Sequence, residues 1–139
     1  MTQPTPLDVQ TALINVMVLS AVADGDMSDQ ELLIIGDMVD KLPVFRGFDR
    51  ALLDSLAEHC VSRLGDESAL DTILAEVAGT LPHKLYDTAY AVACEVVACD
   101  THAGQEELRF LEMIRDQFTM DRLTAAAIER GIAALNRTF

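Results

Sequence analysis

The chain has 139 residues, half of them hydrophobic, and a mean hydropathy of +0.22. This composition predicts one folded domain over residues 1–139 and excludes a disordered chain. Ten Lys and Arg against 23 Asp and Glu leave a net charge of -13 at pH 7, which argues against nucleic acid as a partner and favours divalent cations and basic protein segments.

Apolar residues recur every three or four positions along most of the chain, which predicts an all-α fold of about seven helices. Helix caps, prolines and glycines place the boundaries, as in the capping box that Ser28 and Glu31 form. In chain order the expected helices are 6–23, a second from Ser28 to before Pro43, a third from Asp49 to Gly65, a fourth from Ser68 to before Pro82, a fifth ending near Cys99, a sixth over 105–118 and a seventh over 120–136.

The first and fifth of these helices are apolar around nearly their whole circumference. A helix of this kind has to be covered on several sides, so both are expected to lie close together at the centre of the fold. For the seventh helix, the spacing of apolar residues predicts a buried side made of Leu123, Ala127, Ile128 and Ile132.

The longest apolar stretch, 12–23, is shorter than the roughly 20 residues that span a bilayer. The first five residues lack the basic region of a secretory signal. The sequence therefore predicts a cytoplasmic protein without a transmembrane segment. Cys60, Cys94 and Cys99 show no CxxC spacing and are expected to be thiols of the core.

An internal repeat emerges when the chain is shifted by 76 residues, with halves at roughly 6–64 and 83–136. The shift aligns Asp24 with Asp100, Glu31 with Glu107 and, after a four-residue deletion, Asp49 with Asp121. Each half then has a nearly all-apolar helix that ends in Asp, a short turn, and a helix with Glu in its first turn. We expect two pseudo-symmetric helical halves that share one core, with the fourth helix as their linker.

The Asp-x6-Glu spacing common to both halves suggests a cation site. Asp24 and Asp100 are expected at helix C-termini, where free carbonyls and the helix dipole disfavour a carboxylate by roughly 0.3 to 1 kcal/mol. A cation would reverse this cost, and a Glu from the next helix would add a further oxygen ligand. Such ligands suit Ca²⁺ first and Mg²⁺ second. The candidate metal ligands are Asp24, Asp26, Glu31, Asp100, His102 and Glu107.

Helix capping competes with the metal interpretation in the first half. A capping box already accounts for Ser28 and Glu31, and a left-handed helix stop accounts for Gly25. Only Asp24 has no role in capping. An EF-hand loop does not fit, because no Gly occupies its sixth position and Ile35 stands at the twelfth in place of Glu.

The second half departs from the first at the turn. His102 replaces Asp26, and it is either a ligand that would shift the site toward transition metals or a solvated loop residue. Glu95, on the apolar fifth helix, either pairs in the core or points toward the acids. We expect the second site to be weaker than the first or differently tuned.

The stretch Ala-Asp-Gly-Asp-Met-Ser-Asp-Gln-Glu-Leu at 23–32, with its weaker second copy, resembles the tellurite-resistance TerB family and its TerB-like relatives. The resemblance implies an all-α fold of two pseudo-symmetric halves whose Asp and Glu pairs bind divalent metal. It also implies a bacterial cytoplasmic protein of the tellurite or chemical stress response, with other stress-response proteins as partners. The motif positions are matched by Asp24, Gly25, Glu31, Asp100 and Glu107, whereas Thr101 and His102 depart from them.

Enzyme motifs are missing from the sequence. It has no Gly-rich phosphate loop, no GxSxG and no HExxH, and His59 and Cys60 point about 100° apart on one helix. The sequence therefore predicts a non-enzymatic acidic protein that binds divalent metal through its two Asp-x6-Glu units and uses no organic cofactor. The alternative is a protein-interaction module whose acidic face binds a basic partner without metal.

Overall fold

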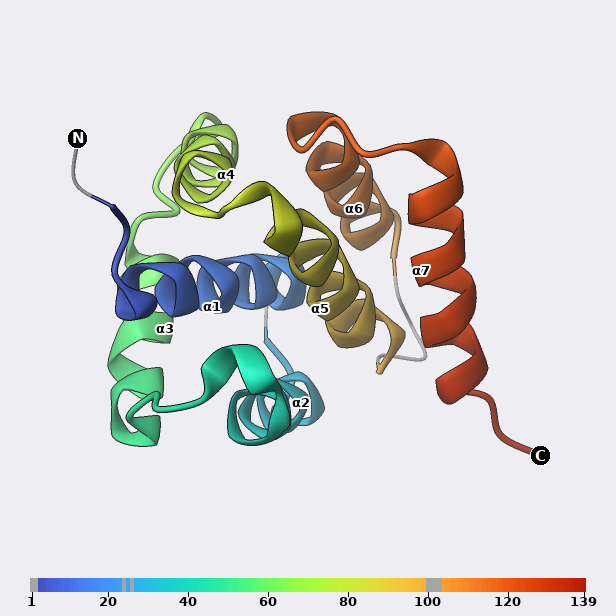
Figure 1. The fold of residues 1–139 in the computed structure, drawn as a ribbon, viewed down its shortest axis with the longest axis horizontal. Coiled ribbons are helices and arrows are strands. Elements are labelled where there is room, and N and C mark those ends of the chain that lie inside the picture. The colour runs from blue at the N-terminus through green and yellow to red at the C-terminus, as the bar shows by residue number, and fades with distance from the viewer. Residues whose placement is uncertain (1–2, 24, 26, 100–103) are drawn as a thin grey trace.

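A computed structural model describes residues 3–23, 25, 27–99 and 104–139 (Figure 1). These residues form seven α-helices and three short 3₁₀ segments, and none of them lies in a β-strand, so the all-α prediction is confirmed. The α-helices are α1 (Pro6–Val22), α2 (Asp29–Lys41), α3 (Leu53–Ser62), α4 (Ala69–Thr80), α5 (Tyr86–Ala98), α6 (Gln105–Gln117) and α7 (Arg122–Leu135). The 3₁₀ segments are η1 (Pro43–Phe45), η2 (Arg50–Leu52) and η3 (His83–Leu85).

Local capping chemistry sets the first helix boundaries. Before α1, the Thr5 hydroxyl accepts the Asp8 N–H at 3.0 Å, and the Asp8 carboxylate accepts the Thr5 N–H at 2.9 Å. Ser28 and Glu31 form the same reciprocal pair before α2, as the sequence predicts. Gly25 follows α1 with a φ of 115°, a conformation that glycine adopts without the strain a Cβ would cause.

Two other helix starts differ from the sequence prediction. Asp49 accepts the Ala51 N–H at 3.0 Å and so caps η2, while α3 itself begins at Leu53. Before α4, the Ser68 hydroxyl donates to the Asp66 carboxylate at 2.7 Å and therefore does not cap the helix. The Asp66 carboxylate thus competes for the Ser68 hydroxyl, whereas Asp49 caps a 3₁₀ segment that runs directly into α3.

The helices pack around one hydrophobic core that draws on both halves of the chain. Figure 1 shows α1 and α5 crossing at its centre, and the two helices contact each other as expected. α1 also contacts α2, α3, α4 and α6, whereas α5 also contacts α2, α6 and α7. The second helix of each half thus packs against the central helix of the other half as well as its own.

The helix bounds follow the offset of 76 residues. α1 and α5 end at Val22 and Ala98, and α2 and α6 begin at Asp29 and Gln105. α2 and α6 have 13 residues each. The third helices, α3 and α7, each pack on the central helix of their own half. Only α4 has no counterpart among the helices of the described residues.

The predicted buried side of α7 is right for Ile128 and Ile132, which pack against the core, and wrong for Leu123 and Ala127. Leu123 is 80% exposed and Ala127 is exposed, whereas Ala125 is buried and Ile128 and Ile132 are partly buried. The cause lies in Glu129, which accepts a hydrogen bond from Tyr90 of α5. This contact turns the side of α7 that carries residues 125, 128, 129 and 132 toward α5.

All three cysteines are buried and form no disulfide, as expected for thiols of the core. Burial raises the pKa of the Cys60 and Cys94 thiols to about 11. Neither thiol is therefore activated as a nucleophile or a metal ligand. None of the helices that the described residues form has the length and apolarity needed to cross a membrane.

Candidate metal centre

The structure describes two of the six predicted metal ligands. Glu31 and Glu107 occupy the third position of α2 and of α6, so the repeat places them equivalently. The other four, Asp24, Asp26, Asp100 and His102, lie outside the described residues.

Glu31 is buried at the start of α2, with only 1% of its surface exposed. Its Oε1 accepts the Ser28 N–H at 2.8 Å, which is the expected capping contact. Its Oε2 has less than 1 Å² of accessible surface and no hydrogen-bond partner among the described residues. Burying a carboxylate oxygen without a donor costs free energy, and a bound cation would remove that cost.

Glu107 is also fully buried, at 0% exposure, at the start of α6. Gly104 stands at the N-cap in place of Ser28, so the hydroxyl half of a capping box is missing there. The burial of this carboxylate therefore does not follow from a Ser-type capping box. Both halves place a buried carboxylate at the same helical position, where the helix dipole favours a negative charge.

Asp8 provides a direct comparison for these two glutamates. It lies at the third position of α1 and forms a complete capping box with Thr5, yet it is exposed. Capping a helix in this fold does not require burial of the acid. The burial of Glu31 is a feature beyond its capping contact.

The fit to a metal ion is partial within the described chain. Over residues 3–23, 25, 27–99 and 104–139, no three His, Cys, Asp or Glu side chains come together as a metal-binding group. The donor set of Glu31, with its unsatisfied carboxylate oxygen, is the hard oxygen chemistry that Ca²⁺ and Mg²⁺ prefer. A complete site at Glu31 or Glu107 thus requires the predicted ligands in the turns that precede them.

Glu95 is hydrogen-bonded at the rim of the molecule and is not paired inside the core, while the acids of the turns lie outside the described residues. Its Oε1 accepts a hydrogen bond from Asn136 Nδ2 at 3.1 Å, and its side chain is partly buried. The contact joins the end of α5 to the end of α7, so the partner of Glu95 is at the rim of the core.

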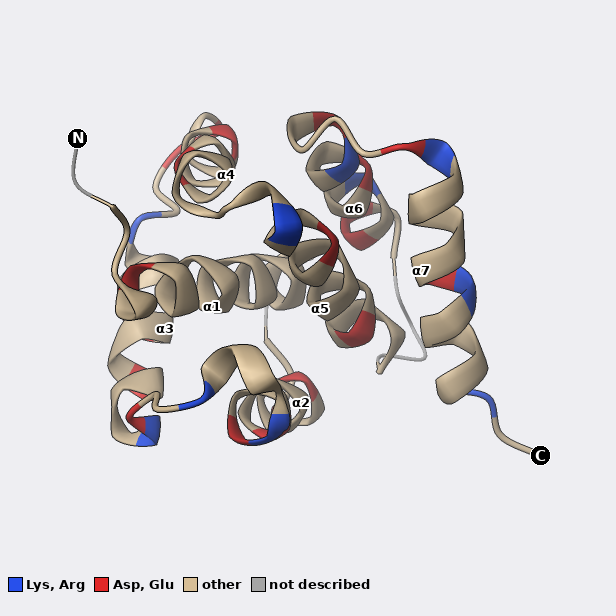
Figure 2. Cartoon of the chain, viewed as in Figure 1, with Lys and Arg blue, Asp and Glu red and all other residues tan. Residues whose placement is uncertain are grey.

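Charge is spread over the whole molecule, and Figure 2 shows Asp and Glu on each of the labelled helices. Three ion pairs join described residues: Arg50 with Asp40 at 3.1 Å, Arg63 with Glu76 at 2.8 Å, and Arg115 with Glu129 at 3.2 Å. This distribution does not single out one acidic face.

A polar network that the sequence did not predict joins α5, α6 and α7. The buried Tyr90 hydroxyl donates to Glu129 Oε2 and accepts from Arg115 Nη1 at 2.6 Å. Burial, and then the bond to Glu129, raise the pKa of Tyr90 above its ordinary value. No local pattern could have revealed this network, because its members come from three helices. It is a structural contact that fixes α7.

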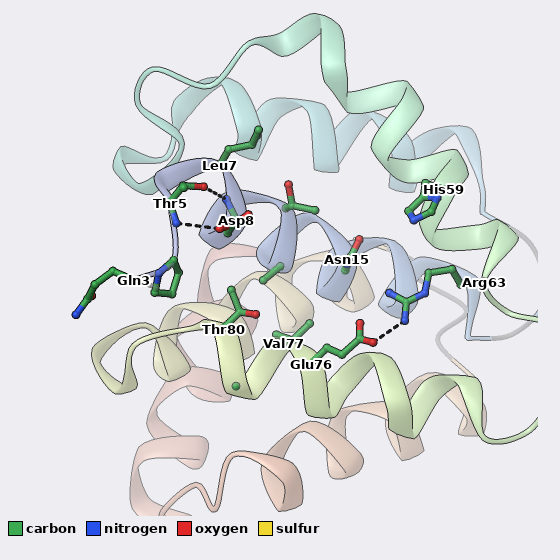
Figure 3. Close-up of a pocket in the computed structure, with 14 residues that line it drawn as sticks. Gln3, Thr5, Leu7, Asp8, Asn15, His59, Arg63, Glu76, Val77 and Thr80 are labelled. Carbon is green, nitrogen blue, oxygen red and sulfur yellow. Dashed lines mark hydrogen bonds and ion pairs between the residues drawn. The ribbon is translucent and has the colours of Figure 1, made fainter. Parts of the chain in front are cut away.

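A cleft of about 620 Å³, lined by polar and apolar side chains alike, lies between the N-terminal segment, α1, α3 and α4 (Figure 3). At one end Arg63 Nη2 donates to Glu76 Oε1 at 2.8 Å, and at the other end lies the Thr5–Asp8 capping box. His59 lines the cleft while Cys60 is buried in the core, so the two side chains do not form a catalytic pair.

Comparisons with known proteins do not assign the chain to a family. No family model matches it, and neither the curated proteins nor the solved structures include a significant match. The resemblance to the TerB family therefore stays a prediction that rests on the sequence motif.

Proposed function

We propose that this protein binds divalent metal, Ca²⁺ in preference to Mg²⁺, through its two Asp-x6-Glu units, and that it is a non-enzymatic TerB-like protein of a bacterial stress response in the cytoplasm. The observation that carries the proposal is the buried Glu31 carboxylate, whose Oε2 has no hydrogen-bond partner in the described chain. The equivalent burial of Glu107 in the other half supports it.

The first unit is the stronger candidate because all its expected ligands are oxygens. Glu31 would hold the ion together with Asp24 and Asp26, which precede it in the sequence. The positive charge of the ion would compensate the negative charge of the buried Glu31 carboxylate. In the second unit, the expected ligands are Asp100, His102 and Glu107. A neutral imidazole in place of a carboxylate lowers the attraction for a hard cation.

Calorimetric titration of the full chain with calcium chloride and with magnesium chloride tests the proposal. We expect saturable binding that Glu31→Gln weakens by about tenfold or more, because the amide removes a charge and a ligand oxygen. The matched control is Asp8→Asn, which changes an exposed acid at the same helical position of α1. It should leave the affinity unchanged.

The opposite result would be informative as well. If neither cation binds, and both shift the melting temperature no more than sodium chloride of matched ionic strength, the glutamates are not metal ligands. The protein-interaction alternative would then replace metal binding as the function of the acidic residues.

A further inference from the structure

A mostly apolar groove of about 480 Å³ lies between α2, α5 and α7. Its apolar lining includes Ile34, Met38, Leu42, Ala91, Ile132 and Leu135. We call it the open groove. Although the core of the molecule is well buried, most of these side chains are partly exposed, and Leu135 is 80% exposed.

The internal repeat gives this groove a counterpart in the other half. Shifting the chain maps α5, α7 and α2 onto α1, α3 and α6, and the packing follows the same map. α7 packs on α5 as α3 packs on α1, and α2 packs on α5 as α6 packs on α1. The surface bounded by α1, α3 and α6 is therefore the equivalent of the open groove.

In the counterpart, α4 covers this surface. α4 packs against α1 and α6, and its Glu76 accepts a hydrogen bond from Arg63, which follows the last residue of α3 (Figures 1 and 3). It contributes Ile73, Leu74 and Val77 to the core. No helix of the described chain covers the open groove in the same way, because the repeat has one linker helix for two equivalent surfaces.

Equivalent residues show the effect of this cover. Ile34 and Met38 of the open groove are partly exposed. Their equivalents on α6, Phe110 and Ile114, are 1% and 0% exposed. The first half of the molecule thus shows what buries this kind of surface, namely one amphipathic helix.

The sequence differences between the two surfaces indicate which helix would fit the open groove. Two acids, Asp37 and Glu95, line it where the covered surface has Met113 and Leu19. Lys41 also lines the open groove, where the covered surface has Gln117, so the lining carries one net negative charge. Basic side chains on the incoming helix would pair with these carboxylates. Conversely, the open groove has Leu135 at the position where the covered surface has Arg63, which donates a hydrogen bond to Glu76 of α4. An apolar residue is therefore expected where α4 carries Glu76.

We propose that the open groove binds a basic amphipathic α-helix of a partner protein, in the position that α4 takes in the other half. Binding of a helix by its apolar stripe in a groove is an established mode of peptide recognition. The net charge of -13 favours a basic partner over a second copy of this chain. The proposal does not depend on metal binding.

The probe for testing it is a fluorescein-labelled synthetic peptide of residues 66–82, held helical by a staple on its exposed face. It carries Glu76→Leu, and Lys in place of Asp66, Glu67 and Asp71. Fluorescence anisotropy with the full chain at near-physiological salt should show saturable binding. A second peptide with the same apolar residues but Glu in place of the lysines should bind more weakly, because it repels Asp37 and Glu95.

Two leucines of α7 provide a matched pair of variants. Leu123 and Leu135 are both 80% exposed, so neither Leu123→Lys nor Leu135→Lys endangers the fold, but only Leu135 lines the open groove. We expect Leu135→Lys to weaken binding of the basic peptide by about tenfold or more, and Leu123→Lys to leave it unchanged.

Three outcomes would overturn the proposal. The first is the absence of saturable binding by the basic peptide. The second is binding that both variants leave equal, which would place the peptide elsewhere on the molecule. The third is self-association of the chain in sedimentation that Leu135→Lys abolishes, because a second copy would then be the occupant of the open groove.

Discussion

The two halves of this molecule share one arrangement of three helices but differ in how its surface is completed. Around α1, the linker helix α4 covers the surface next to α3 and α6. Around α5, the equivalent surface next to α7 and α2 stays open as a groove. The difference teaches that two sets of helices with corresponding packing can still present different surfaces, because the linker helix covers only one of them.

The halves also differ in how their third helix is fixed. α7 is held to α5 and α6 by the network of Tyr90, Arg115 and Glu129. At the equivalent positions the first half has Ile14, Val39 and Ala57, so that α3 is packed there by apolar contacts alone. Polar contacts in the second half and apolar contacts in the first half thus both hold the third helix in place at equivalent positions.

The largest difference between the halves should appear in the cost of losing an apolar side chain. Leu74 lies on α4 and is fully buried, so Leu74→Ala should lower the free energy of unfolding by about 2–5 kcal/mol. Ile132 lies in the open groove and is partly exposed, so Ile132→Ala should cost clearly less. Urea denaturation measures both values. Equal costs would contradict the view that α4 buries a surface that the second half leaves open.

Metal binding, if the proposed function holds, should also differ between the halves. Calcium at 100 times its dissociation constant should add about 2.7 kcal/mol to the free energy of unfolding, seen as a rise in melting temperature. Glu31→Gln should remove more of this increment than Glu107→Gln, because the second unit has His102 in its turn. A larger loss with Glu107→Gln would reverse the order of the two sites.

The polar network of the second half should contribute a smaller amount. Glu129→Gln replaces a charge-assisted acceptor of the Tyr90 hydroxyl by a neutral one and is expected to cost about 1–2 kcal/mol in urea denaturation. Glu58→Gln, an exposed acid of α3, is the matched control and should be near neutral. If both variants have the same small effect, the network does not fix α7.

The last effect is absent at neutral pH and concerns one buried thiol in each half. Burial raises the pKa of Cys60 and Cys94 to about 11 in the folded state, whereas unfolded thiols ionise near pH 8.5 to 9. Between pH 9 and 11 the unfolded chain therefore loses protons that the folded chain keeps, and stability falls as the pH rises, by about 1.4 kcal/mol per pH unit for each thiol. Cys60→Ala should remove one such contribution from the slope, and an unchanged slope would contradict it.

The features that could be predicted from the sequence are local ones. Helical periodicity and the capping box of Ser28 and Glu31 depend on residues three or four apart, so the helices and most of their ends followed from the sequence. The in-register glutamates, Glu31 and Glu107, were likewise visible as an offset in the sequence. Their burial was not, because it depends on which helices cover them.

The features that could not be predicted depend on contacts between distant helices. The buried side of α7 was predicted only in part, because it includes the contact of Glu129 with Tyr90, 39 residues earlier, which no local pattern shows. The open groove was missed for a related reason. Periodicity shows that Ile34 and Met38 lie on an apolar side of α2, but it cannot show that no helix of the described chain covers them.

α2 and α6 each pack on the central helix of the other half, and this packing affects how the protein unfolds. Because α2 packs on α5 and α6 packs on α1, each half completes the core of the other. A fragment cut between the halves would expose both sets of contacts to water at once, so neither fragment retains a closed core of its own. Such interdependence makes unfolding cooperative, and a single transition, with the same midpoint by calorimetry and by circular dichroism, is the thermodynamic signature of this arrangement.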